Sequence, residues 1–124
     1  MRCFYSQELE LELPSGHPFP MEKFRVSKDM LLDGGILRPE EIIEVRAADV
    51  HLLQRVHGLD YVHKIESGQL GRKEQLLLGL PVTPKLYQRS VTEVEATRLA
   101  CHAALVEGVG VCLAGGTHHA FREH

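Results

Sequence analysis

The sequence predicts an α/β fold of the three-layer α/β/α type, with a short, mostly parallel sheet of about three strands and about five helices. Two observations support this prediction. Short β-prone segments alternate with helical segments along the chain, as in parallel sheets. An uninterrupted apolar run, residues 109–114, directly follows a long helical pattern. Such a run is typical of a strand that is buried on both faces.

The composition is that of one ordinary globular domain. The chain has 124 residues, of which 44% are hydrophobic and 25% are charged. These fractions argue against a disordered or collagen-like protein, and we expect residues 1–124 to form a single domain. The net charge of -3 argues against nucleic acid as a partner. Because no apolar run reaches the length of a membrane span and no signal peptide opens the chain, we expect a cytoplasmic protein without a membrane partner.

The first third of the chain contains one predicted strand and one predicted helix. Residues 2–6 are β-prone, and residues 8–13 alternate glutamate with leucine, which suits an exposed extension or a frayed strand. Three prolines make residues 14–20 a stiff loop. Residues 21–32 have a helical composition, and the glycines that follow Asp33 predict the end of this helix.

The middle of the chain contains a second short strand and several short helices. Residues 41–45 are the strand candidate. Residues 47–56 have apolar residues at helical spacing, and residues 59–65 predict a further helical turn or two. The glycine-rich stretch 68–82 contains at most a short helix, around residues 73–78.

The clearest element is a long helix over residues 84–107. Thr83 is a favourable N-cap, proline occupies the first helical position, and Gly108 falls where helices commonly end. The apolar positions predict one stripe on this helix, made of Tyr87, Val91, Val94, Cys101 and Leu105 and widened by alanines near the C-terminus. The buried strand candidate, residues 109–114, follows immediately.

The three cysteines lack the spacing of a metal site. We interpret Cys3, Cys101 and Cys112 as reduced thiols of the core. Cys112 lies in the middle of the last predicted strand, which argues against a role as a nucleophile.

Eight histidines are present, and two of them follow the buried strand. Gly115 and Gly116 allow a tight turn there, and His118 and His119 come directly after Thr117. Ligands of parallel sheets bind beyond the carboxyl ends of the strands. An imidazole titrates near neutral pH and suits proton transfer, so His118 and His119 are candidate catalytic residues. The alternative is that the pair is an incidental feature of a surface loop.

Residues 114–121 (Ala-Gly-Gly-Thr-His-His-Ala-Phe) resemble the tandem-histidine motif of the histone deacetylase and acetoin-utilisation family, within the arginase-deacetylase superfamily. The nearest branch is the bacterial one that is similar to class IV enzymes. Residues 16–23, 56–62 and 79–84 resemble further segments of that branch in order and spacing. The resemblance therefore implies the amino-terminal portion of an arginase/deacetylase fold.

The resemblance implies a zinc-dependent hydrolase that removes an acetyl or other acyl group from an amine, such as acetyl-lysine or an acetylated polyamine. By position, His119 would be the general base and acid, and His118 would stabilise the oxyanion environment. The resemblance also implies that His17, Phe19 and Phe121 border the substrate channel.

The family's zinc ligands, an Asp-x-His pair and a further aspartate, lie downstream of the tandem histidines, and its catalytic tyrosine follows them. The chain given ends at His124. We therefore expect it to bind no metal and to be inactive on its own, although zinc is expected for the full-length family. Asp49 and His51 mimic the Asp-x-His pair, but they lie in a predicted helix, on which their side chains would point apart. A zinc site of His118, His119 and His124 would lack a carboxylate or thiolate ligand.

A second hypothesis is a non-catalytic assembly module. The family fold implies that the first strand lies between the second and the third, which leaves residues 109–114 as an open apolar edge. Such an edge invites pairing, so we expect a homo-oligomer or a partner chain that supplies the missing carboxyl-terminal half. A third hypothesis is that the chain is a fragment of a longer gene product. The acyl substrate and the oligomeric state do not follow from the sequence.

Overall fold

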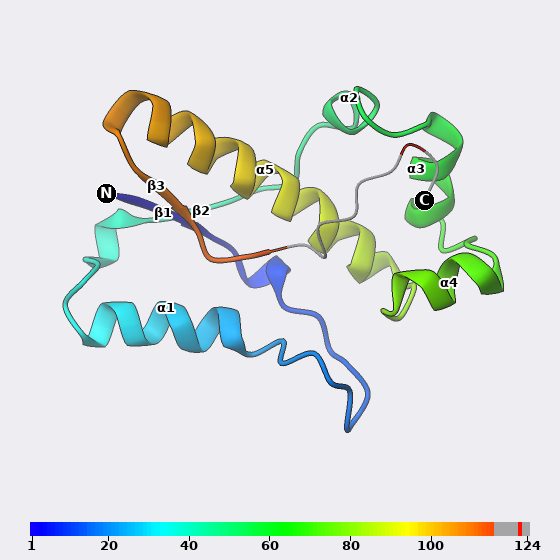
Figure 1. Ribbon diagram of the computed structural model, residues 1–124, viewed down its shortest axis with the longest axis horizontal. Helices are drawn as coiled ribbons and strands as arrows, with labels where there is room; N and C mark the ends of the chain where they lie inside the picture. Colours follow the sequence, from blue (N-terminus) through cyan, green and yellow to red (C-terminus); the bar gives the residue numbers. More distant parts are fainter. Residues whose placement is uncertain (116–121, 123–124) are drawn as a thin grey trace.

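A small parallel sheet lies between helices in this protein (Figure 1). The structure is a computed structural model and describes residues 1–115 and 122. Its strands are β1 (Arg2–Tyr5), β2 (Ile42–Glu44) and β3 (Gly110–Cys112), in the order β2-β1-β3. Both pairs of strands are parallel. The predicted α/β fold with a parallel sheet is therefore confirmed, as is the central place of the first strand.

The sheet is covered on both faces because neighbouring side chains of a strand point to opposite sides. Phe4 of β1 packs with alanines of α5 (Pro84–Glu107) on one face. The adjacent Tyr5 packs with Phe24 of α1 (Lys23–Asp33) on the other face. Figure 1 shows these two helices on opposite sides of the strands. The result is the three-layer arrangement that the sequence predicts.

The bounds of α5 agree with the prediction at both ends. The Thr83 hydroxyl oxygen accepts a hydrogen bond from the Leu86 amide at 3.2 Å, as an N-cap should. Gly108 ends the helix with a φ of 85°, in the left-handed region that glycine adopts without strain.

The predicted apolar stripe of α5 is wrong in part. Val94, Cys101 and Leu105 are exposed, and Leu105 is 87% exposed. Val91 is buried as predicted, together with Thr92 and a row that repeats every three or four residues: Leu86, Arg89, Glu93, Ala96, Ala100 and Ala103. Small alanines allow α5 to approach β3 closely, so the larger apolar side chains near its end face outward. The core role predicted for the Cys101 thiol is wrong for the same reason, whereas Cys3 is fully buried.

The predicted helix over residues 47–56 is a single turn, α2 (Val50–Leu53). Asp49 does not continue the helix but caps it, and its carboxylate accepts a hydrogen bond from the His51 amide at 2.8 Å. The premise that Asp49 and His51 lie together in a helix is therefore wrong, because Asp49 is the extended N-cap residue that precedes α2.

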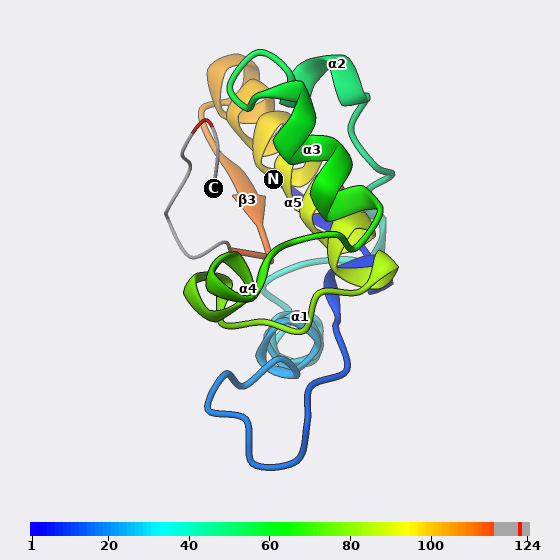
Figure 2. The ribbon, with the colours of Figure 1, turned by 90° about the vertical axis from the view of Figure 1, so that its right-hand side faces the viewer.

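Two further helices complete the side of the molecule that faces the carboxyl ends of the strands. They are α3 (Leu59–Glu66) and α4 (Arg72–Leu78). Val62 of α3 packs with Val91 of α5, which places α3 alongside the long helix (Figure 2).

The segment after β1 does not form the predicted exposed extension. The Ser6 hydroxyl oxygen accepts a hydrogen bond from the Glu8 amide at 3.3 Å and starts a short 3-10 helix, η1 (Gln7–Leu9). This turn directs Leu9 into the core, where it is 0% exposed. A second 3-10 helix, η2 (Pro39–Glu41), precedes β2. In the parts of the chain that the structure covers, we find no helix with the length and apolar character of a membrane span.

The packing of β3 on α5 leaves no room for a side chain at Gly110. A methyl group there would overlap the Ala100 carbonyl oxygen and lie 3.1 Å from the Ala103 methyl group. We expect Gly110→Ala to lower the free energy of unfolding by about 1–3 kcal/mol in urea denaturation. Val109→Ala, at the exposed neighbouring position, serves as the control and should change it by about 0.5 kcal/mol. Equal losses in the two variants would contradict the tight contact.

Candidate functional site

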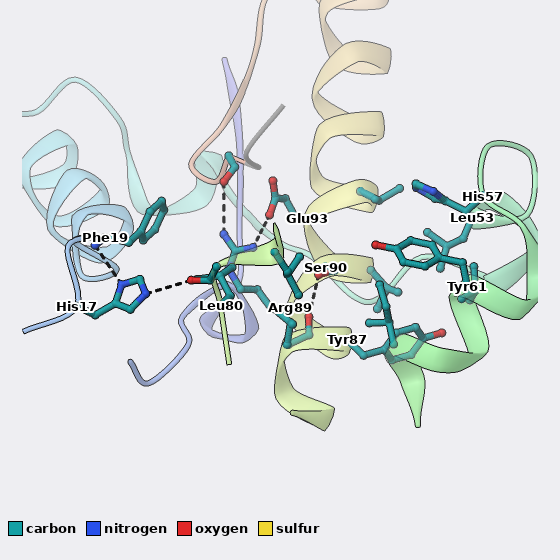
Figure 3. A pocket seen from close by; sticks show the side chains of 18 of the residues that line it. His17, Phe19, Leu53, His57, Tyr61, Leu80, Tyr87, Arg89, Ser90 and Glu93 are labelled. Carbon is teal, nitrogen blue, oxygen red and sulfur yellow. Dashed lines mark hydrogen bonds and ion pairs between the residues drawn. The ribbon is translucent and has the colours of Figure 1, made fainter. Parts of the chain in front are cut away.

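A cleft of about 830 Å³ lies beyond the carboxyl end of β3, where Gly115 forms part of its wall. Ligands of parallel sheets bind at this end of the strands. The remaining wall comes from the loops 17–20 and 78–80, from Leu53 of α2 and His57 after it, from α3 and from the first half of α5 (Figure 3). Most of the lining side chains are apolar: Pro18, Phe19, Pro20, Leu53, Val62, Ile65, Leu78, Leu80, Leu86, Val91 and Val94.

Two of the residues predicted from the sequence line this cleft. His17 and Phe19 form one side of it, and their role in a substrate channel stays a prediction. The other three predicted site residues, His118, His119 and Phe121, lie outside the described residues, and their roles also stay predictions.

His17 joins the two loops that border the cleft. Its Nδ1 atom lies 3.1 Å from the Phe19 amide nitrogen, and its Nε2 atom lies 3.2 Å from the Gly79 carbonyl oxygen. A backbone amide can only donate, so Nδ1 is the unprotonated nitrogen of the ring. The protonated Nε2 then donates to the Gly79 carbonyl, and one imidazole fixes the distance between the loops (Figure 3).

The Phe19 ring is held in the wall by its neighbours. It packs against Phe24 with the ring centroids 6.2 Å apart. The Lys23 ammonium lies 4.4 Å from the Phe19 centroid, which is within the range of a cation–π interaction. The side of the cleft near the first loop is therefore a preformed aromatic surface.

The opposite wall carries aromatic rings with polar tips. The rings of His57 and Tyr61 pack against each other with centroids 5.7 Å apart. Burial, and secondarily the charge of Glu74, raises the pKa of Tyr61. Burial, and secondarily the charge of Glu66, raises the pKa of Tyr87. Both phenols therefore stay protonated at neutral pH and are able to donate hydrogen bonds to a bound molecule.

A buried ion pair lies between these two walls (Figure 3). Arg89 is 5% exposed, and its Nη1 atom lies 2.7 Å from a carboxylate oxygen of Glu93. Its Nε atom donates to the Leu9 carbonyl oxygen at 3.1 Å. Its Nη2 atom donates to the Gly115 carbonyl oxygen at 3.4 Å. The guanidinium carbon also lies 5.9 Å from the centroid of Phe24.

The sequence prediction did not include Arg89, Glu93, Tyr61 or Tyr87. A signal for the ion pair was present, because Arg89 and Glu93 are four residues apart on one helix face and have opposite charges. They also continue the spacing of the alanines Ala96 and Ala100. A charged pair within a stripe of small apolar residues indicates burial, whereas a pair on a polar face indicates solvent exposure.

The described residues do not provide a zinc site. Within residues 1–115 and 122, no three side chains of histidine, cysteine, aspartate or glutamate come close enough together to hold a metal ion. Their arrangement instead suits binding: apolar walls for a hydrocarbon chain, with an imidazole, two phenols and an ion pair at the edges.

The chain is similar in sequence to one protein family and to several curated proteins. Residues 17–124 match the histone deacetylase domain. The chain is 38% identical over 117 residues to an uncharacterized protein of Picosynechococcus sp., with 94% of this chain and 39% of the relative covered. It is 27% identical over 127 residues to the acetoin utilization protein AcuC of Staphylococcus aureus strain MRSA252, with 94% of this chain and 33% of the relative covered. The chain thus spans well under half the length of these curated relatives.

Two substitutions separate the hydrogen bonds of His17. Asparagine places its oxygen near the position of Nδ1 and keeps the acceptor for the Phe19 amide, as in an Asx turn. Glutamine places its amide nitrogen near Nε2 and keeps the donor to Gly79. We expect His17→Asn and His17→Gln each to lose about 0.5–1.5 kcal/mol of unfolding free energy, and His17→Ala to lose more.

Hydrogen exchange distinguishes the two bonds of His17. The Phe19 amide should exchange faster in His17→Gln than in His17→Asn, because only asparagine retains its acceptor. The same exchange rate in both variants would contradict the assigned geometry.

Proposed function

The chain belongs to the histone deacetylase family, and we propose that its cleft binds the acyl amide of an acylated amine for hydrolysis. The substrate class is an acetyl or similar acyl group on a lysine side chain or a polyamine. The observation that carries the proposal is the position of the cleft, which lies beyond the carboxyl end of β3 and is bordered by Gly115. In the sequence, Gly115 opens the segment that contains the tandem histidines.

The lining of the cleft supports an acylated amine as ligand. The methylene chain of a lysine or a polyamine needs an apolar passage, and the walls around Phe19, Val62 and Leu80 are apolar. The phenols of Tyr61 and Tyr87 line the cleft and are donors that suit the carbonyl oxygen of an amide, because a tyrosine is protonated at neutral pH.

The tandem histidines would carry the proton transfer in this proposal. His119 would take a proton from the attacking water and return one to the leaving amine, which suits a group that titrates near neutral pH. His118 would stabilise the developing oxyanion. The family resemblance implies zinc, but residues 1–115 and 122 do not fit a zinc site. We assign to these residues the binding and orientation of the acyl amine, and we do not expect the 124-residue chain to turn over substrate alone.

A binding experiment tests the proposal. An acetyl-lysine peptide is added to the isotopically labelled chain, and backbone NMR shifts are followed. We expect shifts of residues around the cleft, Phe19, Tyr61 and Tyr87 among them, and a severalfold weaker affinity for Phe19→Ala. Leu105→Ala, at an exposed position near the far end of α5, is the matched control and should bind as the unchanged chain does. Equal binding of the unacetylated peptide, or the absence of shifts, would refute the proposed ligand.

Turnover is measured separately with the same peptide and added zinc. We expect no release of acetate by the 124-residue chain. Release that His119→Ala abolishes would show that the chain acts alone and would contradict this part of the proposal.

A second function is favoured by the edge of the sheet. Among the described residues, β3 pairs with β1 only, so its other side is an open edge. Leu105, Val106 and Val109 near its start are 87%, 70% and 45% exposed. An open strand edge beside exposed apolar side chains favours pairing with another chain. We propose self-association through β3, or assembly with a partner chain, as this alternative function.

Light scattering tests the assembly. At micromolar concentration the chain should have a mass above that of the monomer, and Val109→Lys should reduce it, because a lysine at a strand edge opposes pairing. A monodisperse monomer over this concentration range would exclude self-association.

A further inference from the structure

We infer that Arg89 is a positioning residue of the cleft, which fixes the point where the chain leaves β3 by holding the Gly115 carbonyl. The inference deepens the proposed function, and only its consequence for catalysis rests on that function. Its geometry rests on three hydrogen bonds of one guanidinium group: to Leu9, to Glu93 and to Gly115.

The acceptors of Arg89 come from separate parts of the chain. The Leu9 carbonyl lies 80 residues before Arg89 in the sequence, and the Gly115 carbonyl lies 26 residues after it. The donors of a guanidinium lie in one plane at fixed angles, so acceptors on several sides determine its orientation. Arg89 thereby sets the position of Gly115 relative to η1 as well as to α5.

Glu93 holds the guanidinium in place. Its carboxylate lies 2.7 Å from Nη1 of Arg89, and both residues belong to helix α5, four positions apart. Glu93 is only 9% exposed. A buried charge is tolerated when a partner neutralises it and acceptors satisfy its donors. The Glu93 carboxylate neutralises the charge of Arg89 and accepts from Nη1. The Nε and Nη2 atoms are therefore available to donate to the carbonyl groups of Leu9 and Gly115.

The place of Arg89 and Glu93 in the fold indicates that they hold Gly115 in position, and do not merely stabilise the packing of α5. Apolar side chains of α5 on either side of the pair supply its packing on the sheet: Ala96, Ala100 and Ala103 contact Phe4 further along the helix, and Leu86 packs with Tyr5 one turn before Arg89. Arg89, Glu93 and Gly115 lie at the cleft (Figure 3). Since Gly115 precedes the Gly-Thr-His-His segment in the sequence, a displaced Gly115 would also displace the start of that segment.

The carbonyl carbon shift of Gly115 in NMR spectra tests the inference on the complete 124-residue chain. We expect Arg89→Ala and Arg89→Lys both to change this shift. Lysine keeps the charge but lacks the planar arrangement of donors. The matched control is Arg98→Ala, which removes an exposed arginine paired with Glu95 on the same helix. A Gly115 shift in Arg89→Lys that equals that of the control would overturn the inference, and this variant decides the question if Arg89→Ala does not fold.

Chemical rescue of Arg89→Ala distinguishes the planar shape of the guanidinium group from its positive charge. Arg89→Ala leaves a space that opens on the cleft and is surrounded by Glu93 and two carbonyl oxygens. We expect millimolar methylguanidinium to return the Gly115 shift toward its original value in a saturable manner. Methylammonium carries the same charge and should not do so. Equal effects of the two cations would show that Arg89 acts only as a counter-charge, which would also overturn the inference.

These readouts are independent of substrate binding. If the acetyl-lysine peptide fails to bind while the Gly115 shift responds as expected, the proposed function fails and the role of Arg89 in positioning stands. If the peptide binds while the shift stays unchanged in both Arg89 variants, the proposed function stands and the positioning role fails.

Discussion

A buried guanidinium in the second turn of helix α5 connects segments that lie near the two ends of the described chain. Arg89 bonds to the carbonyl groups of Leu9 and Gly115 and to the carboxylate of Glu93. A charge that is 5% exposed is stable only where such acceptors surround it. The turn after β1, the helix α5 and the end of β3 must therefore meet at this point, and the cleft opens beside it.

Small residues determine how the rest of the molecule is arranged around that point. Ala96, Ala100 and Ala103 bring α5 onto the sheet, and Gly110 allows β3 to pass the helix at close range. The first half of α5 lines the cleft together with α3 and two loops. His17 bonds to both of these loops, so the space between them is set by a side chain whose ring nitrogens are both engaged.

Local chemistry explains which parts of the fold the sequence predicts. The bounds of α5 follow from Thr83 and Gly108, which satisfy backbone groups close to them in the sequence. The buried face of α5 depends on the contact with β3, so a pattern of large apolar residues wrongly placed Leu105 inside. Leu9 is buried for a similar reason of tertiary packing. The family resemblance singled out His17 and Phe19, which line the cleft, and their role in a substrate channel stays a prediction. The sequence did not single out Arg89 and Glu93, because charged residues four apart on a helix are usually exposed to solvent.

The most direct test of this account is the NMR signal of the Arg89 Nε proton. We expect this proton to exchange with solvent much more slowly than that of the exposed Arg98. We also expect the guanidinium protons of Arg89 to show nuclear Overhauser contacts to residues 9 and 115 together. Exchange as fast as that of Arg98, without contacts to either residue, would contradict the account.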